Sequence, residues 1–138
     1  MTKASAPAIR LEGVVKTFPN PLDAARPIRA VDGISLKAGG AEASDRLIAL
    51  VGPDGAGKST FMRLLCGLVA PDEGRLSVLG TTPDPDNEDF TTRIAFMPQT
   101  LGLYKTLSCR ENLEVFAGLR GFEGEADGAA GLERRIAE

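Results

Sequence analysis

The segment "LIALVGPDGAGKSTFMRLL", residues 47–65, changes its residue pattern twice. Residues 47–51 are all apolar, which is typical of a parallel strand covered on both faces. Glycine-rich sequence follows, and four apolar residues then recur at helical spacing: Phe61, Leu64, Leu65 and Leu68. Such spacing predicts a helix with one buried face. The segment therefore predicts a buried strand, a glycine loop and an amphipathic helix in succession.

The loop between this strand and this helix fits the pattern G-x-x-x-x-G-K-[ST]. Glycines allow positive φ, so that successive N–H groups can turn inward around an anion, and the helix dipole adds positive potential. We expect Lys58 to reach the β- and γ-phosphates of a nucleotide, Ser59 to bind Mg²⁺ and Thr60 to contact the α-phosphate side. The predicted site residues are Gly52, Pro53, Asp54, Gly55, Ala56, Gly57, Lys58, Ser59 and Thr60. The alternative is a plain tight turn, and the correct strand and helix periods on either side favour phosphate binding over it.

Composition narrows the classes of protein. The chain has 138 residues, 43% of them hydrophobic, which suits one globular domain or a piece of one. Its 16 basic and 19 acidic residues give a net charge of -3, so no nucleic-acid surface is expected. Cys66 and Cys109 lack CxxC spacing and the chain has no histidine, which argues against a zinc site. Without an apolar run of about 20 residues, a soluble, cytoplasmic chain is expected.

Further elements are predicted on both sides of the loop. Alternating apolar residues predict strands in "AIRLEG" (8–13), "GISLK" (33–37) and "RLSVLG" (75–80), and "RIAFMPQ" (93–99) is another apolar run, which ends at Pro98. The connection between the first two strands contains three prolines and is expected to be irregular. Ser108 and Glu111 form a capping-box pattern, which predicts a helix beginning at Ser108.

Two longer segments carry a family resemblance. "GPDGAGKSTFMRLLCGLVAPDEGRLSVLG" (52–80) and "RIAFMPQTLGLYKTLSCRENL" (93–113) together resemble the ATP-binding subunits of ABC transporters, specifically the multidrug-exporter type. The resemblance covers about residues 8–120 and implies ATP and Mg²⁺ as cofactors. It makes Gln99 the Q-loop glutamine, which contacts Mg²⁺ and the attacking water, and Phe18 the adenine-stacking aromatic, where the family more often has tyrosine.

The same resemblance implies that Thr100–Leu107 docks against the coupling helix of a transmembrane subunit. Each of these assignments has a plainer alternative. Phe18 could only add apolar area at a strand end, Gln99 could be an ordinary polar residue after a strand, and "LGLY" (101–104) could be the core of a loop.

Several motifs of the resembled family do not occur in this sequence. The LSGGQ signature, the Walker B strand and the switch histidine are absent. The expected fold is therefore a partial α/β P-loop NTPase domain, a single truncated ABC-type domain over 1–138. Its expected parts are an N-terminal antiparallel β region (1–46), a core with parallel strands through the Q-loop (47–99), and the start of the helical subdomain (100–138).

Three functions remain open on these grounds. The leading one is the N-terminal portion of an ATPase subunit that energises export, working at the inner face of the membrane with a transmembrane subunit and a second ATP-binding domain. On this reading the fragment binds ATP and does not hydrolyse it. The alternatives are a small P-loop kinase, for which "ERR" (133–135) offers an arginine-bearing lid, and a non-catalytic nucleotide-binding or interaction module. A GTPase is disfavoured because no N-K-x-D motif is present.

Overall fold

The structure, a computed structural model, describes residues 7–40, 47–100 and 102–119. The chain divides into two compact units, Met1–Ala95 and Phe96–Glu138. The first unit holds the predicted phosphate loop, and the second holds Gln99 and the segment that follows it.

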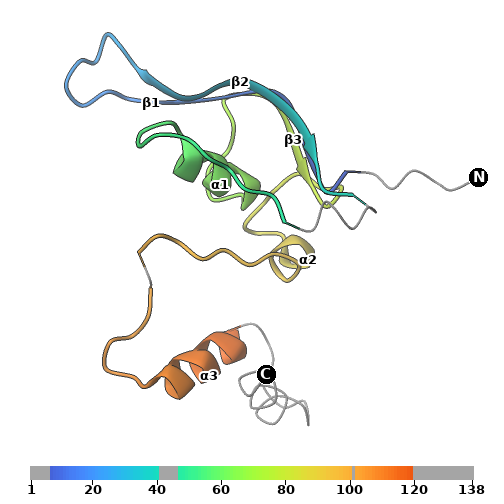
Figure 1. Cartoon of the computed structure of the whole chain (residues 1–138), viewed down its shortest axis with the longest axis vertical. Helices are drawn as coiled ribbons and strands as arrows, with labels where there is room; N and C mark the ends of the chain where they lie inside the picture. The colour runs from blue at the N-terminus through green and yellow to red at the C-terminus, as the bar shows by residue number, and fades with distance from the viewer. Residues whose placement is uncertain (1–6, 41–46, 101, 120–138) are drawn as a thin grey trace, which may run out of the picture. The chain divides into compact units, whose positions relative to one another are not determined.

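An antiparallel sheet organises the described part of the first unit (Figure 1). Its strands are β1 (Ile9–Phe18), β2 (Ile28–Ala38) and β3 (Glu73–Val78), in the order β2-β1-β3. The central strand β1 runs antiparallel to both neighbours. The predicted strands at the start of the chain and after the helix are confirmed, and the proline-rich connection forms the irregular end of the β1–β2 hairpin.

One face of this sheet and the helix α1 (Lys58–Leu65) enclose the hydrophobic core. The buried core residues are Leu11, Val14, Val31, Phe61, Leu64, Leu65, Leu76, Val78 and Phe90. Phe90 belongs to the short helix α2 (Glu88–Thr91), where the Asn87 side chain accepts the Phe90 N–H. Burying a side chain of this size stabilises a fold by about 1.5–3 kcal/mol. The core therefore fixes α1, and with it the loop before α1, against the sheet.

Helix α1 is confirmed but ends earlier than its apolar spacing predicts. Gly67 has a φ of 73° and donates its N–H to the Leu64 carbonyl, while the Leu68 N–H reaches the Arg63 carbonyl. These two bonds form a Schellman motif, which closes a helix through a left-handed glycine. The predicted burial of Leu68 is wrong, because this residue lies beyond the turn and is 53% exposed.

The predicted buried parallel strand over residues 47–51 is wrong for the described structure, and the apolar run at 93–99 does not form a strand either. Leu47 and Val51 are 90% and 89% exposed, and Met97 is largely exposed as well. A buried parallel strand needs hydrogen-bonding neighbours along its edges and covered faces. No strand among the described residues pairs with either segment. The apolar run alone therefore does not produce a strand.

The second unit contains the helix α3 (Cys109–Leu119), which starts where the capping box predicts. The Glu111 carboxylate accepts the Ser108 N–H at 2.7 Å, and the Ser108 hydroxyl accepts the Glu111 N–H at 3.3 Å. This reciprocal pair satisfies N–H groups that have no partner within the helix. The capping-box prediction is confirmed.

We expect the start of α3 to respond to acid. Hydrogen bonds from the Ser108 hydroxyl and then from its N–H hold the pKa of Glu111 below its ordinary value of 4.5. Because this pKa is lowered in the folded state, its stabilising contribution is complete above pH 4.5 and is lost as the pH falls through the folded value. The Ser108 amide proton, followed by NMR, should shift over that range. In Glu111→Gln the shift should disappear, and an unchanged titration in that variant would contradict the assignment.

Candidate functional site

The loop of residues 52–57 has the backbone shape that an anion nest requires. Gly55 and Gly57 have φ values of 80° and 83°, and the Ala56 N–H donates to the Pro53 carbonyl at 3.3 Å. Left-handed backbone at two nearby positions turns neighbouring N–H groups toward one side. Gly52, Pro53, Asp54, Gly55 and Ala56 are exposed, so the loop surface is open to a ligand.

The N-terminus of α1 adds to the same nest. Its N-cap is Gly57, no side chain caps it, and its first turn contains no acidic residue. A helix start without a capping side chain has free N–H groups and the positive end of the helix dipole. These groups favour a bound anion such as a phosphate.

Strand β2 sets the position of the loop through its backbone. A Cβ atom added to Gly57 would overlap the carbonyl oxygen of Ala30, which lies in β2. A Cβ added to Gly55 would meet no atom within 4 Å. Gly57 is therefore packed directly on the sheet, whereas Gly55 lies on the open side of the loop.

Lys58 bends back over the loop that precedes it. Its Nζ donates to the carbonyl oxygens of Gly52 and Pro53, both at 2.6 Å. The ammonium group is thereby held across the loop, near the N–H groups that would contact an anion. This places a positive charge where phosphates would need one.

Ser59 and Thr60 follow in the first turn of α1, with Ser59 exposed and Thr60 partly buried. A hydroxyl oxygen at the edge of the nest suits Mg²⁺, which prefers oxygen ligands and usually binds with substrate phosphates. In the described residues, no cluster of three or more histidine, cysteine or acidic side chains could hold a metal ion by itself. Among the described residues, the protein would therefore supply few ligands to a bound Mg²⁺.

Phe18 lies at the end of β1, paired with Ile28 of β2. Ala30, on which Gly57 packs, is two residues further along the same strand. Two residues along a strand and one strand across correspond to about 8 Å between backbones. The register therefore brings the predicted adenine-stacking residue to the same end of the sheet as the loop.

Gln99 and the segment Thr100–Leu107 belong to the second unit. Gln99 is exposed, as are Leu103 and Tyr104, while Leu101 lies outside the described residues. The structure thus brings together Phe18 and the phosphate loop within one unit. The roles of Gln99 and of the docking segment stay predictions, and the "ERR" segment lies outside the described residues.

Asn112 is a residue that sequence reasoning missed. Its buried side chain accepts the Tyr104 N–H at 2.8 Å and donates to the carbonyls of Tyr104, Leu107 and Ser108 at 3.0–3.1 Å. It therefore closes the loop that precedes α3 and shapes the predicted docking segment. The only signal in the sequence is a polar residue inside the first turn of a helix, which is common on exposed surfaces as well.

Replacing Asn112 with leucine should open this loop. The variant keeps the branched shape of the side chain but leaves the Tyr104 N–H and the bonded carbonyls without partners, which costs about 1–3 kcal/mol. Hydrogen exchange at the Tyr104 amide should become faster by roughly ten- to hundredfold. Asn112→Asp keeps the acceptor for that amide and should protect it better than leucine does. Equal exchange in the parent protein and the leucine variant would show that Asn112 does not hold the loop.

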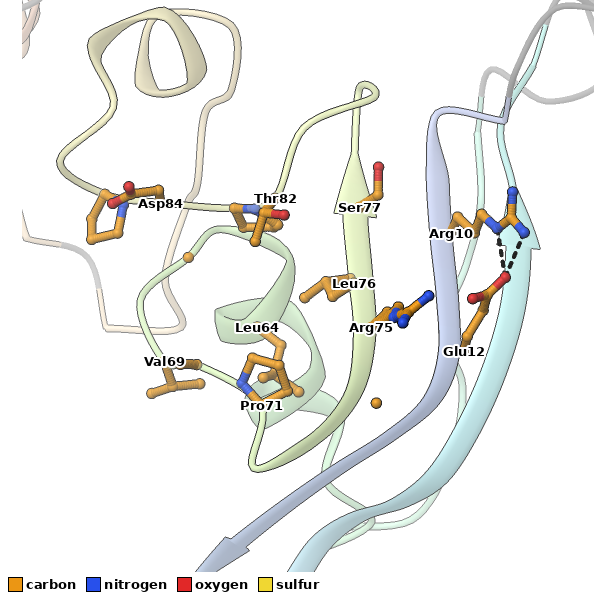
Figure 2. A pocket seen from close by; sticks show the side chains of 15 residues that line it. Arg10, Glu12, Leu64, Val69, Pro71, Arg75, Leu76, Ser77, Thr82 and Asp84 are labelled. Atoms are coloured by element: carbon orange, nitrogen blue, oxygen red, sulfur yellow. Dashed lines mark hydrogen bonds and ion pairs between the residues drawn. The ribbon is translucent and has the colours of Figure 1, made fainter.

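A separate hollow of about 630 Å³ lies in the first unit beside β1 and β3 (Figure 2). Leu64 and Leu76 contribute apolar side chains, and Arg10 and Glu12 form an ion pair on β1. None of the predicted phosphate-loop residues lines it. The nucleotide site is therefore assigned from the loop geometry and not from this hollow.

No helix among the described residues is long and apolar enough to cross a membrane.

The sequence model of the ABC transporter family matches residues 41–137. This is more than half of the chain, and the chain belongs to this family. The resemblance of residues 52–80 and 93–113 to ABC transporter ATP-binding subunits is confirmed.

Three similar proteins are named as ATP-binding proteins of transport systems. The chain is 41% identical over 118 residues to the probable multidrug ABC transporter ATP-binding protein YbhF of Escherichia coli K12, covering 86% of this chain and 19% of that protein. It is 40% identical over 111 residues to the ribose import ATP-binding protein RbsA 2 of Rubrobacter xylanophilus, covering 79% and 19%. It is 38% identical over 109 residues to the Nod factor export ATP-binding protein I of Rhizobium sp. N33, and this match covers 79% of this chain and 32% of that protein. The chain spans less than a third of the length of these relatives.

Solved structures agree with this family. The ATP-binding cassette MJ0796 in a dimeric post-hydrolysis state, bound to ADP and Pi, matches with a TM-score of 0.71 and 25% identity, over 94% of this chain and 54% of that one. A second dimeric structure of MJ0796, described as a bacterial ABC transporter cassette, matches with a TM-score of 0.64 and 27% identity, over 81% and 47%. They confirm the predicted fold class, a partial P-loop NTPase domain of the ABC ATPase type.

Proposed function

We propose that this chain is the ATP-binding portion of an ABC transporter ATPase subunit that energises export. The observation that carries the proposal is the loop of residues 52–57, with two left-handed glycines, an uncapped helix start and the Lys58 ammonium held across it. Such a loop supplies N–H donors and positive charge on one open surface. Both favour a triphosphate.

Each residue of the loop has a role in this proposal. The N–H groups around Gly55 and Gly57 cradle the phosphates, and Lys58 exchanges its loop carbonyls for β- and γ-phosphate oxygens. Ser59 and Gln99 would hold Mg²⁺, which when bound neutralises charge on the phosphates. Phe18 stacks on adenine.

Export is the proposed direction because the multidrug-type relative shares 41% identity over 86% of this chain. A ribose import protein matches almost as well, so the direction of transport would be set by the membrane partner. We place that partner, a transmembrane subunit, against Thr100–Leu107. A second ATP-binding domain completes the assembly at the inner face of the membrane.

We further propose that the chain binds Mg-ATP weakly and does not hydrolyse it. Phosphoryl transfer to water needs cradled phosphates, metal anchors and a group that positions the water. The loop supplies the first of these. The sequence has no histidine, and the described residues contain no acidic cluster that could anchor the metal.

The test combines calorimetry with phosphate release from saturating Mg-ATP. We expect saturable binding near one equivalent and a turnover far below about 1 s⁻¹, the lower end of ordinary enzyme rates. Turnover at that rate, with Lys58→Ala inactive as a check on contamination, would instead favour a compact ATPase, or a kinase if it needed an acceptor. Absence of any ATP binding would favour the interaction module.

A further inference from the structure

Asp72 ties down the end of β1 that carries Phe18. Its carboxylate accepts the Lys16 ammonium at 2.7 Å and the Thr17 N–H at 2.6 Å. Its own N–H donates to the Val15 carbonyl at 2.9 Å. One residue, next to the start of β3, therefore bonds to three consecutive residues of β1.

These bonds continue the contacts on the β3 side of β1 past the last paired residues. The pairing of β1 with β3 ends at Val15 and Glu73, after a register shift between Glu12 and Val15. Bulges re-aim side chains and leave ladder groups without strand partners. Asp72 supplies a partner here, so it fixes the direction in which the last residues of β1 point.

Lys16 continues this chain of contacts to the ring. Its Nζ lies 5.5 Å from the centroid of the Phe18 ring, within the range of a cation–π interaction. The Lys16 side chain is only 16% exposed. Asp72 therefore binds the ammonium of a largely buried lysine side chain that lies over one face of the ring.

We propose that Asp72 and Lys16 are positioning residues for base recognition, holding the Phe18 ring so that its other face is presented to the adenine of ATP. This inference rests on the proposed nucleotide-binding function. Neither residue touches the nucleotide in this arrangement. An aromatic ring fixed before binding loses less freedom when a base stacks on it, and affinity rises accordingly.

The alternative is an ordinary surface ion pair, and such pairs contribute little to stability. The same strand offers a matched example, because Arg10 donates to Glu12 at 2.8 Å between exposed side chains. Glu12→Gln is therefore the control for Asp72→Asn. Both changes remove a carboxylate charge from an ion pair with a basic residue of β1.

The first measurement is calorimetric titration of the full chain with Mg-ATP and with inorganic Mg-triphosphate. Asp72→Asn and Lys16→Met should weaken ATP binding by about three- to tenfold and leave triphosphate binding unchanged, as should Phe18→Ala, since stacking involves the base alone. Lys16→Arg should retain most of the affinity, because a guanidinium also binds over an aromatic face. Glu12→Gln should leave both ligands unaffected.

The second measurement needs no nucleotide. The ring-proton NMR resonances of Phe18 should shift in Asp72→Asn and stay in place in Glu12→Gln. Unmoved resonances, or equal losses for ATP and triphosphate, would overturn the proposal. If Lys58→Ala bound triphosphate as tightly as the parent protein, the nucleotide site itself would be wrong. The Phe18 resonance test does not depend on that result.

Discussion

Lys58→Ala is expected to weaken Mg-ATP and inorganic Mg-triphosphate by about the same factor, roughly ten- to hundredfold. The substitution removes a charge-assisted contact to the β- and γ-phosphates, worth on the order of 1.5–3 kcal/mol, and each 1.4 kcal/mol is a factor of ten in affinity. The base is not involved, which is why both ligands should respond equally. Calorimetric titration of each ligand gives the two ratios directly.

The control for this experiment is Lys37→Ala, which removes an exposed lysine from β2. It changes the net charge by the same amount and should leave both affinities nearly unchanged. Unfolding curves of the two variants would show that each retains its fold. If folded Lys58→Ala bound ATP as tightly as the parent protein, the phosphate-site assignment would be wrong.

Gly57→Ala is expected to abolish measurable nucleotide binding and to destabilise the first unit. A left-handed backbone with a Cβ costs about 1–2 kcal/mol, and overpacking adds typically 1–3 kcal/mol. Both apply here, because the φ of Gly57 is 83° and its Cβ would overlap the Ala30 carbonyl. The loop or β2 must then move. Urea unfolding and ATP titration measure the two effects.

Gly55→Ala separates the two causes. Gly55 has almost the same φ, 80°, and open space where a Cβ would lie. This variant should therefore lose only the backbone contribution of about 1–2 kcal/mol. Equal destabilisation by the two substitutions would mean that packing on Ala30 does not position the loop.

Local patterns predicted local structure well. The glycine loop, the helix that follows it and the Ser108 capping box depend on residues close together in sequence, and all three are observed. The end of α1 also depends on a nearby residue, Gly67. The prediction followed the apolar spacing as far as Leu68 and so placed Leu68 on the buried face of the helix. A glycine after a helical run deserves more weight than one further apolar position.

Features that depend on distant partners were missed. Residues 47–51 have the composition of a buried strand, but a strand forms only when another pairs with it, and their own sequence does not contain that partner. The bonds from Asp72 to Lys16 and Thr17 join residues more than fifty positions apart. The role of Asn112 was missed for a related reason, because this side chain acts by hydrogen bonding to backbone groups of the preceding loop, and a sequence pattern does not show such bonds.

The position of Lys58 affects how heats of binding should be understood. In the structure its ammonium already has two carbonyl partners, Gly52 and Pro53. A triphosphate that enters the loop must take that ammonium from them, so one set of oxygen acceptors replaces another. The enthalpy measured by calorimetry is then a difference between bonds made and bonds broken. A small heat would thus be compatible with a strong contact, and affinity is the better measure of this lysine.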